Sequence, residues 1–101
     1  MMYTHNVRME HNTFQNNWGT ASYAILLKDI TDSYIINNNF VSNTVGIFME
    51  GGNRIEVKKN IFKENGWALK IQANCTDNII SQNNFLNNTF DVATNGTMVL
   101  E

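Results

Sequence analysis

The sequence contains no proline, a single cysteine and no long apolar run. A lone Cys75 excludes a disulfide within the chain, so no disulfide framework holds the fold. No apolar segment approaches the roughly 18 residues that a membrane-spanning helix needs. The first six residues are polar and show no signal-peptide pattern. The net charge of −2 is spread without long runs, which argues against the basic stripe of a nucleic-acid groove.

Asparagine is the most conspicuous residue, with 18 copies among 101 residues. Asparagine-rich tracts of low complexity are usually disordered or prone to aggregate. Here the asparagines recur in register with apolar residues, and 43% of the chain is hydrophobic. Both facts favour a periodic fold, because stacked asparagines can form hydrogen bonds along strands spaced about 4.7–4.8 Å apart. Asparagine also tolerates the left-handed backbone of a tight corner.

The pattern Asn-x-Phe-x-x-Asn occurs four times. Its phenylalanines lie 26, 22 and 23 residues apart, and a period in the low twenties is typical of a solenoid. The copies are Asn12-Thr13-Phe14 with Asn17, Asn38-Asn39-Phe40 with Asn43, Asn60-Ile61-Phe62 with Asn65, and Asn83-Asn84-Phe85 with Asn88.

Alignment on the phenylalanines shows two further apolar columns. Five residues before each phenylalanine lie Met9, Ile35, Val57 and Ile80. A second apolar run follows each phenylalanine and contains Ile25, Ile47, Leu69 and Val92; in the third copy it alternates as a strand does. Polar segments at 29–33, 51–53 and 74–78 predict turns. Each repeat is therefore predicted to be a strand, a corner, a short strand and a polar turn.

A unit of this size cannot bury its own apolar face, so we expect the repeats to stack. The predicted fold is all-β, a right-handed single-stranded parallel β-helix of about four coils of 22–26 residues, at roughly 7–32, 33–54, 55–77 and 78–101. The handedness follows from the general rule for parallel crossovers. The apolar columns should point inward. The first coil is four residues longer than the second, and the excess at 18–23 predicts a protruding loop. Neither end resembles a solenoid cap, so we expect an uncapped fragment of a longer domain.

Three kinds of side chain are candidates for function. Glycoside hydrolysis needs two facing carboxyl groups, and the candidate acids are Asp29 with Asp32, Glu50, Glu56, Glu64, Asp77 and Asp91. Pectin-cleaving β-helices would also show an Arg-Ile-Lys segment, where this chain has Arg54-Ile55-Glu56. A polysaccharide-cleaving protein predicts at least two carboxylates in one groove, whereas acids scattered over a solvated face would be structural.

Soft metal ligands and aromatic platforms are the other two kinds. His5, Met9 and His11 have copper-competent side chains, but Met9 belongs to a core column and His11 should face outward. Cys75 lies in a predicted turn and is a candidate for exposure, while Met49 falls in a core column. The aromatic candidates for a ligand face are Trp18, Trp67, Tyr23 and Tyr34. Glycosylation patterns begin at Asn74, Asn87 and Asn95, and in so asparagine-rich a chain we attribute them to chance.

The repeat resembles that of the broad β-helix superfamily of carbohydrate-binding proteins and sugar hydrolases. Two stretches are more particular: residues 63–73, KENGWALKIQA, and residues 84–96, NFLNNTFDVATNG. They resemble the C-terminal coils of the NosD-type maturation protein of nitrous oxide reductase. The resemblance implies a periplasmic, non-catalytic β-helix that works with an ATPase and a permease of ABC-transporter type in assembling the copper–sulfur centre. It transfers no catalytic, cofactor or metal residue to this segment, although copper is possible for the intact protein.

Two functions therefore remain open, besides a purely structural role for these coils. One is a maturation scaffold that binds protein partners. The alternative is a polysaccharide-binding or polysaccharide-cleaving β-helix protein.

Overall fold

The computed structural model describes residues 1–72, 74–94 and 98–100, and in this part of the chain it contains thirteen strands and no helix. The strands form three parallel sheets that we name after a central member. The β4 sheet consists of β1 (Arg8–Glu10), β4 (Thr31–Ile36), β7 (Asn53–Lys58), β10 (Asn78–Ser81) and β13 (Met98–Leu100). The β5 sheet consists of β2 (Thr13–Gln15), β5 (Asn39–Val41), β8 (Ile61–Lys63) and β11 (Asn84–Leu86). The β6 sheet consists of β3 (Tyr23–Lys28), β6 (Val45–Glu50), β9 (Trp67–Ile71) and β12 (Phe90–Thr94).

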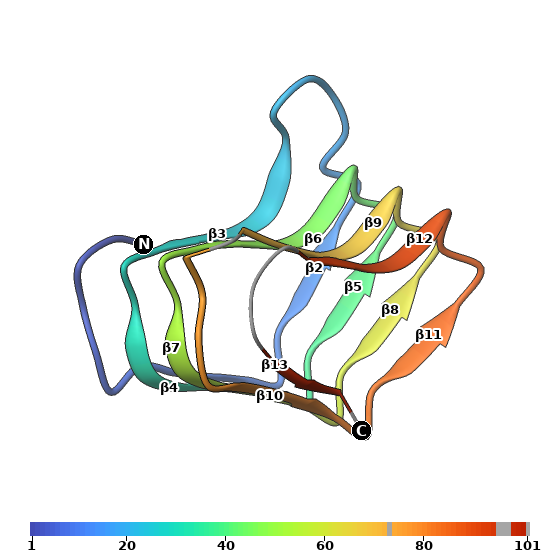
Figure 1. Ribbon diagram of the computed structural model, residues 1–101. Helices are drawn as coiled ribbons and strands as arrows, with labels where there is room; N and C mark the ends of the chain where they lie inside the picture. Colours follow the sequence, from blue (N-terminus) through green and yellow to red (C-terminus); the bar gives the residue numbers. More distant parts are fainter. Residues whose placement is uncertain (73, 95–97, 101) are drawn as a thin grey trace.

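The chain visits the three sheets in turn and then begins the next coil, which gives a parallel β-solenoid of about four coils (Figure 1). Each strand pairs in parallel with its equivalents one coil away, so Phe40 is in register with both Phe14 and Phe62. The predicted all-β solenoid is thus confirmed. The prediction of polar turns was wrong in part, because β4 begins at Thr31, β7 at Asn53 and β10 at Asn78.

The predicted inward columns form the core. Phe40 and Phe62 are fully buried, and their rings stack with centroids 4.7 Å apart. The stack continues to Phe14 at 5.0 Å and to Phe85 at 5.3 Å. The rest of the core consists mainly of Ile25, Leu27, Ile35, Ile47, Met49, Ile55, Val57, Leu69, Ile71 and Ile80, with Met9 and Val92 packed against it.

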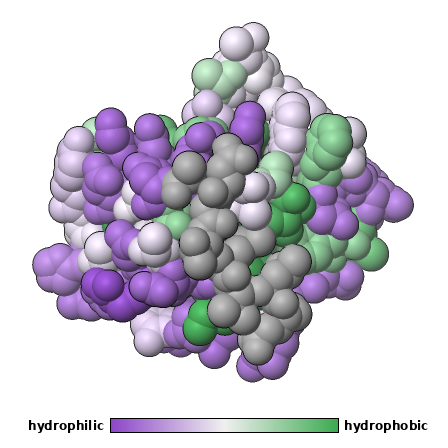
Figure 2. Space-filling view, viewed as in Figure 1, coloured by the Kyte–Doolittle hydropathy of each residue, from purple (hydrophilic) through white to green (hydrophobic). Residues whose placement is uncertain are grey.

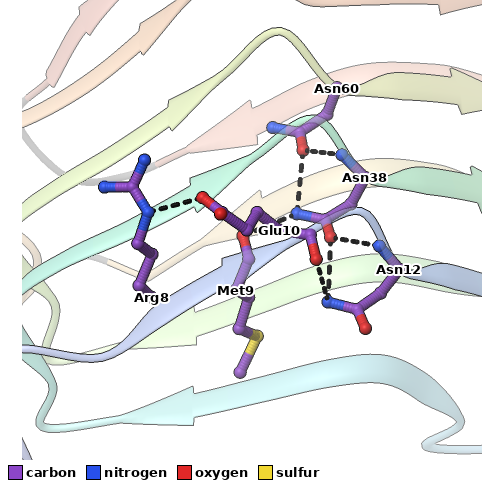
Figure 3. A network of polar contacts seen from close by, with 6 residues as sticks. All are labelled: Arg8, Met9, Glu10, Asn12, Asn38 and Asn60. Atoms are coloured by element: carbon purple, nitrogen blue, oxygen red, sulfur yellow. Dashed lines mark hydrogen bonds and ion pairs between the residues drawn. The ribbon is translucent and has the colours of Figure 1, made fainter.

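Two asparagine ladders, which are buried in the two middle coils, flank the phenylalanine stack and connect each coil to the next. In one of them, shown in Figure 3, the Oδ1 atom of Asn60 accepts hydrogen bonds from the backbone N–H of Asn38, at 2.8 Å, and from its Nδ2, at 3.1 Å. In the same way, Asn38 Oδ1 accepts hydrogen bonds from the backbone N–H and the Nδ2 of Asn12. Among the described residues, no buried side-chain nitrogen or oxygen lacks a partner, so the polar ladders are compatible with a dry core.

The corners have left-handed backbone, but at a different residue from the one predicted. Positive φ falls on the residue before each ladder asparagine, as at Asn37, with φ of 56°, and Lys59, with φ of 57°. The ladder asparagines point inward, and the preceding residues turn the chain. A further positive-φ column contains Asn6, Asp32, Arg54 and Asp77. Non-glycine residues adopt this conformation rarely, so its repetition shows that stacking of the coils imposes it.

The first coil carries the predicted protrusion. The connection between β2 and β3 stands away from the stack (Figure 1), and Trp18 within it is 57% exposed. The backbone N–H of Gly19 donates to the hydroxyl of Thr44, which ties the start of this loop to the next coil.

Candidate functional site: a groove on the β4 sheet

A groove of about 320 Å³ lies on the outer side of the β4 sheet. In the space-filling view, the side that carries β4 and β7 is mostly hydrophilic (Figure 2). The groove is lined by Asn6, Asp32, Tyr34, Arg54, Glu56, Asp77 and Ile79.

Two columns of the solenoid form the groove. The first is the positive-φ column of Asn6, Asp32, Arg54 and Asp77. Each of these four residues stands eight residues before a phenylalanine of the repeat. The second column stands six residues before each phenylalanine, where Tyr34 is paired with Glu56, and Glu56 with Ile79. Side chains two residues apart on a strand point to the same face, so the two columns lie beside one another on the solvent side.

An Asp32–Arg54 ion pair spans two coils at one border of the groove. Arg54 Nε donates to Asp32 Oδ1 at 2.7 Å, and Arg54 Nη2 donates to Oδ2 at 3.0 Å. These hydrogen bonds lower the pKa of Asp32 below its usual value of 3.8 and raise that of Arg54. Both side chains are exposed, so the pair contributes little to the stability of the fold.

The two other acids of the groove have no comparable partner. Neither the Glu56 nor the Asp77 side chain makes a hydrogen bond or ion pair within the residues that the structure describes. Asp77 acts on Arg54 only through its charge. Tyr34, which is 39% exposed, has the guanidinium carbon of Arg8 at 5.6 Å from its ring centroid. One side of this ring is thus already occupied by a cation.

The predicted acids therefore separate into two groups. Asp32, Glu56 and Asp77 line one groove. The other candidates, Asp29, Glu50, Glu64 and Asp91, are not among its lining residues. Asp29, although only three residues from Asp32, belongs to a different corner and faces Gly51. The missed signal was the phenylalanine register, which applies to polar columns as well as to apolar ones.

The soft side chains named as candidate ligands have different surroundings in the part of the chain that the structure describes. Within the described ranges, no three His, Cys, Asp or Glu side chains lie together in a way that could hold a metal ion. Met9 packs against the core, whereas His5 and His11 are exposed. Cys75 is fully buried, contrary to the expected exposure. Its Sγ accepts a hydrogen bond from Gly52 N–H at 3.3 Å and donates to a backbone carbonyl at 3.5 Å.

The aromatic candidates are divided between two sheets and the loop between β2 and β3, which contains Trp18. Tyr34 lines the groove, whereas Tyr23 and Trp67 belong to the β6 sheet. Tyr23 contacts Phe48, with ring centroids 4.7 Å apart. Trp67 stacks on Phe90 at 5.3 Å and has Lys70 Nζ 4.8 Å above its ring. The four predicted aromatics therefore do not form one platform.

Two other sequence features have limited structural counterparts. Asn74 and Asn87, which begin glycosylation patterns, are exposed, and Asn95 lies outside the described residues. The described residues include no helix of the length and apolarity required to cross a membrane.

The comparisons with known proteins place this fold in a family. The family model described as periplasmic copper-binding protein (NosD) matches residues 1–100. Neither the curated proteins nor the solved structures gave a match. The family description names copper. The match spans nearly the whole solenoid, and the chain belongs to the NosD family of periplasmic copper-binding β-helix proteins.

Proposed function

We propose that the chain is part of a non-catalytic periplasmic scaffold that assists assembly of the copper centre of nitrous oxide reductase. The observation that carries the proposal is the NosD family match over residues 1–100. A rigid stack of coils suits such a role, because a solenoid presents long, regularly spaced surfaces to other proteins. In this proposal the partner proteins are an ATPase and a permease of ABC-transporter type. Copper binds to parts of the intact protein other than the groove.

The alternative of a polysaccharide-cleaving protein has one observation in its favour, the three carboxylates of the groove. A glycosidase needs one carboxyl group that stays protonated near neutral pH, which requires a raised pKa. The pKa of Asp32 is lowered instead, because Arg54 donates hydrogen bonds to its ionised carboxylate. Asp32 could therefore serve only as the ionised carboxylate, and Glu56 or Asp77 would have to supply the protonated group. We therefore favour the scaffold.

The scaffold proposal is tested in a nitrous-oxide-reducing bacterium that lacks the intact protein. We expect its nitrous oxide reductase to be exported but to lack the copper–sulfur centre, as measured by copper content and visible absorption. Normal copper loading in the deletion strain would end the proposal. The partner part is tested separately by affinity purification of the intact protein from membranes, in which the ATPase and permease should co-purify.

A further inference from the structure

The groove on the β4 sheet has the composition of a binding site for a positively charged side chain. Its lining contains three carboxylates and one guanidinium, so the groove carries an excess of negative charge. Since Arg54 is engaged by Asp32 through two hydrogen bonds, the remaining charges are those of Glu56 and Asp77.

These two acids lack the donors that an ionised carboxylate normally binds. Glu56 is half-buried and occupies the column position between Tyr34 and Ile79. A carboxylate offers only acceptors, and a partly buried one without donors is stabilised by a cation that also replaces its lost hydration. The groove therefore favours a ligand that brings both hydrogen-bond donors and positive charge.

The walls of the groove suit the aliphatic part of such a ligand. Tyr34 and Ile79 provide apolar surface on either side of Glu56 along the solenoid axis. An arginine side chain has an apolar methylene stem and a planar guanidinium, which can donate two parallel hydrogen bonds to one carboxylate. A neutral sugar fits less well, because it would leave the negative charges of Glu56 and Asp77 uncompensated.

We propose that this groove binds an arginine side chain of a partner protein, with the guanidinium between Glu56 and Asp77 and the stem against Tyr34 and Ile79. The site goes beyond the scaffold function, since it requires neither copper nor a transporter. The positive charge of Arg54 beside Asp32 disfavours a second cation there, so the groove favours a peptide with a single arginine.

The test uses the chain of residues 1–101 in an NMR titration with a capped peptide, Gly-Ala-Arg-Ala-Gly. The matched control peptide replaces arginine with citrulline, which keeps the shape and most donors but lacks the charge. We expect the arginine peptide to shift the amide signals of Tyr34, Glu56 and Ile79, and to bind about three- to tenfold more tightly than the citrulline peptide at low salt. Raising the salt to about 0.5 M should weaken the arginine peptide.

Variants locate the site on the chain. Glu56→Gln and Asp77→Asn should each weaken binding about three- to tenfold, whereas Glu64→Gln, a change of an exposed acid outside the groove, should leave it unchanged. Unaltered amide spectra elsewhere verify that the variants fold. Equal binding of the two peptides, equal effects of all three variants, or tighter binding of a neutral glucose hexasaccharide at the same signals would each overturn the proposal. Loss of copper loading in the deletion strain does not bear on these outcomes, so the two proposals fail separately.

Discussion

Replacing Asn65 with alanine measures how much the buried asparagine ladder contributes to holding the coils together. Asn65 is 2% exposed. Its Oδ1 accepts hydrogen bonds from the backbone N–H of Asn43 at 2.9 Å and from Asn43 Nδ2 at 3.0 Å. Its Nδ2 donates to the carbonyl of Phe40 at 3.0 Å and to Asn88 Oδ1 at 2.9 Å. One side chain thus connects three successive coils.

The expected loss follows from which partners are left unpaired. Alanine at position 65 removes the acceptor of the Asn43 backbone N–H, and a buried donor without a partner costs about 1–3 kcal/mol. The other partners are less affected, since Asn43 Nδ2 keeps the carbonyl of Phe14 and Asn88 Oδ1 keeps the backbone N–H of residue 65. With the three further hydrogen bonds lost, at about 0.5–1.5 kcal/mol each before non-additivity, we expect Asn65→Ala to destabilise the protein by about 3 kcal/mol or more.

Asn17→Ala is the matched control at the end of the same ladder. Asn17 is half-buried, and its side chain makes one hydrogen bond, from Nδ2 to Asn43 Oδ1 at 2.8 Å. Its backbone N–H still donates to that oxygen after the substitution, so we expect a loss of only about 0.5–1.5 kcal/mol. Urea unfolding followed by circular dichroism measures both losses, with equal slopes as the check on two-state behaviour. Losses that agree within about 0.5 kcal/mol would refute the view that ladder stability depends on orphaned backbone groups.

Three further predictions concern the core, the ion pair and the thiol. Phe62→Ala should cost about 3–5 kcal/mol in the same unfolding assay, because its ring is fully buried between two stacked neighbours, whereas the half-buried Phe85→Ala should cost less; equal costs would contradict the packing argument. The pKa of Asp32 is lowered in the folded protein, so its contribution to stability is present above about pH 4 and is lost as the pH falls below it. Asp32→Asn should therefore flatten the stability profile between about pH 4 and 2, and an unchanged profile would show that the pair with Arg54 does not persist in solution. Cys75 should react with a thiol reagent only as fast as the protein opens, so a native rate equal to that in urea would show that the thiol is not buried.

The stacking of coils was predictable because one large side chain repeats at the same place in every coil. Phe14, Phe40, Phe62 and Phe85 define the register, and their burial needs neighbours above and below. The beginnings of β4, β7 and β10 were not predicted, because the polar residues there were interpreted as turns. Ser33 is buried, yet its hydroxyl accepts a hydrogen bond from Val7 N–H, so it serves the backbone rather than a turn.

Corner geometry was less predictable, since it is imposed by neighbouring coils. Asparagine is the residue expected at positive φ, yet Lys59, Glu64 and Gln82 adopt it with φ between 56° and 57°. Each stands directly before a ladder asparagine, whose hydrogen bonds fix the chain direction. The hydrogen bonds of the ladder therefore override the conformational preference of the individual residue. The burial of Cys75 has the same origin, because the turn that contains it is held against Gly52 in the preceding coil.

The groove shows how functional residues should be sought in a solenoid. Asp29 and Asp32 were considered together because they are close in sequence, but each has positive φ at its own corner, and the two belong to different columns. Asp32 and Asp77 are 45 residues apart and line the same groove. Residues at equal offsets from the repeating phenylalanine lie one above another, about 4.8 Å apart per coil. In such a fold the meaningful neighbour of a side chain is the one at the same offset in the next coil, so charge complementarity has to be examined column by column along the repeat.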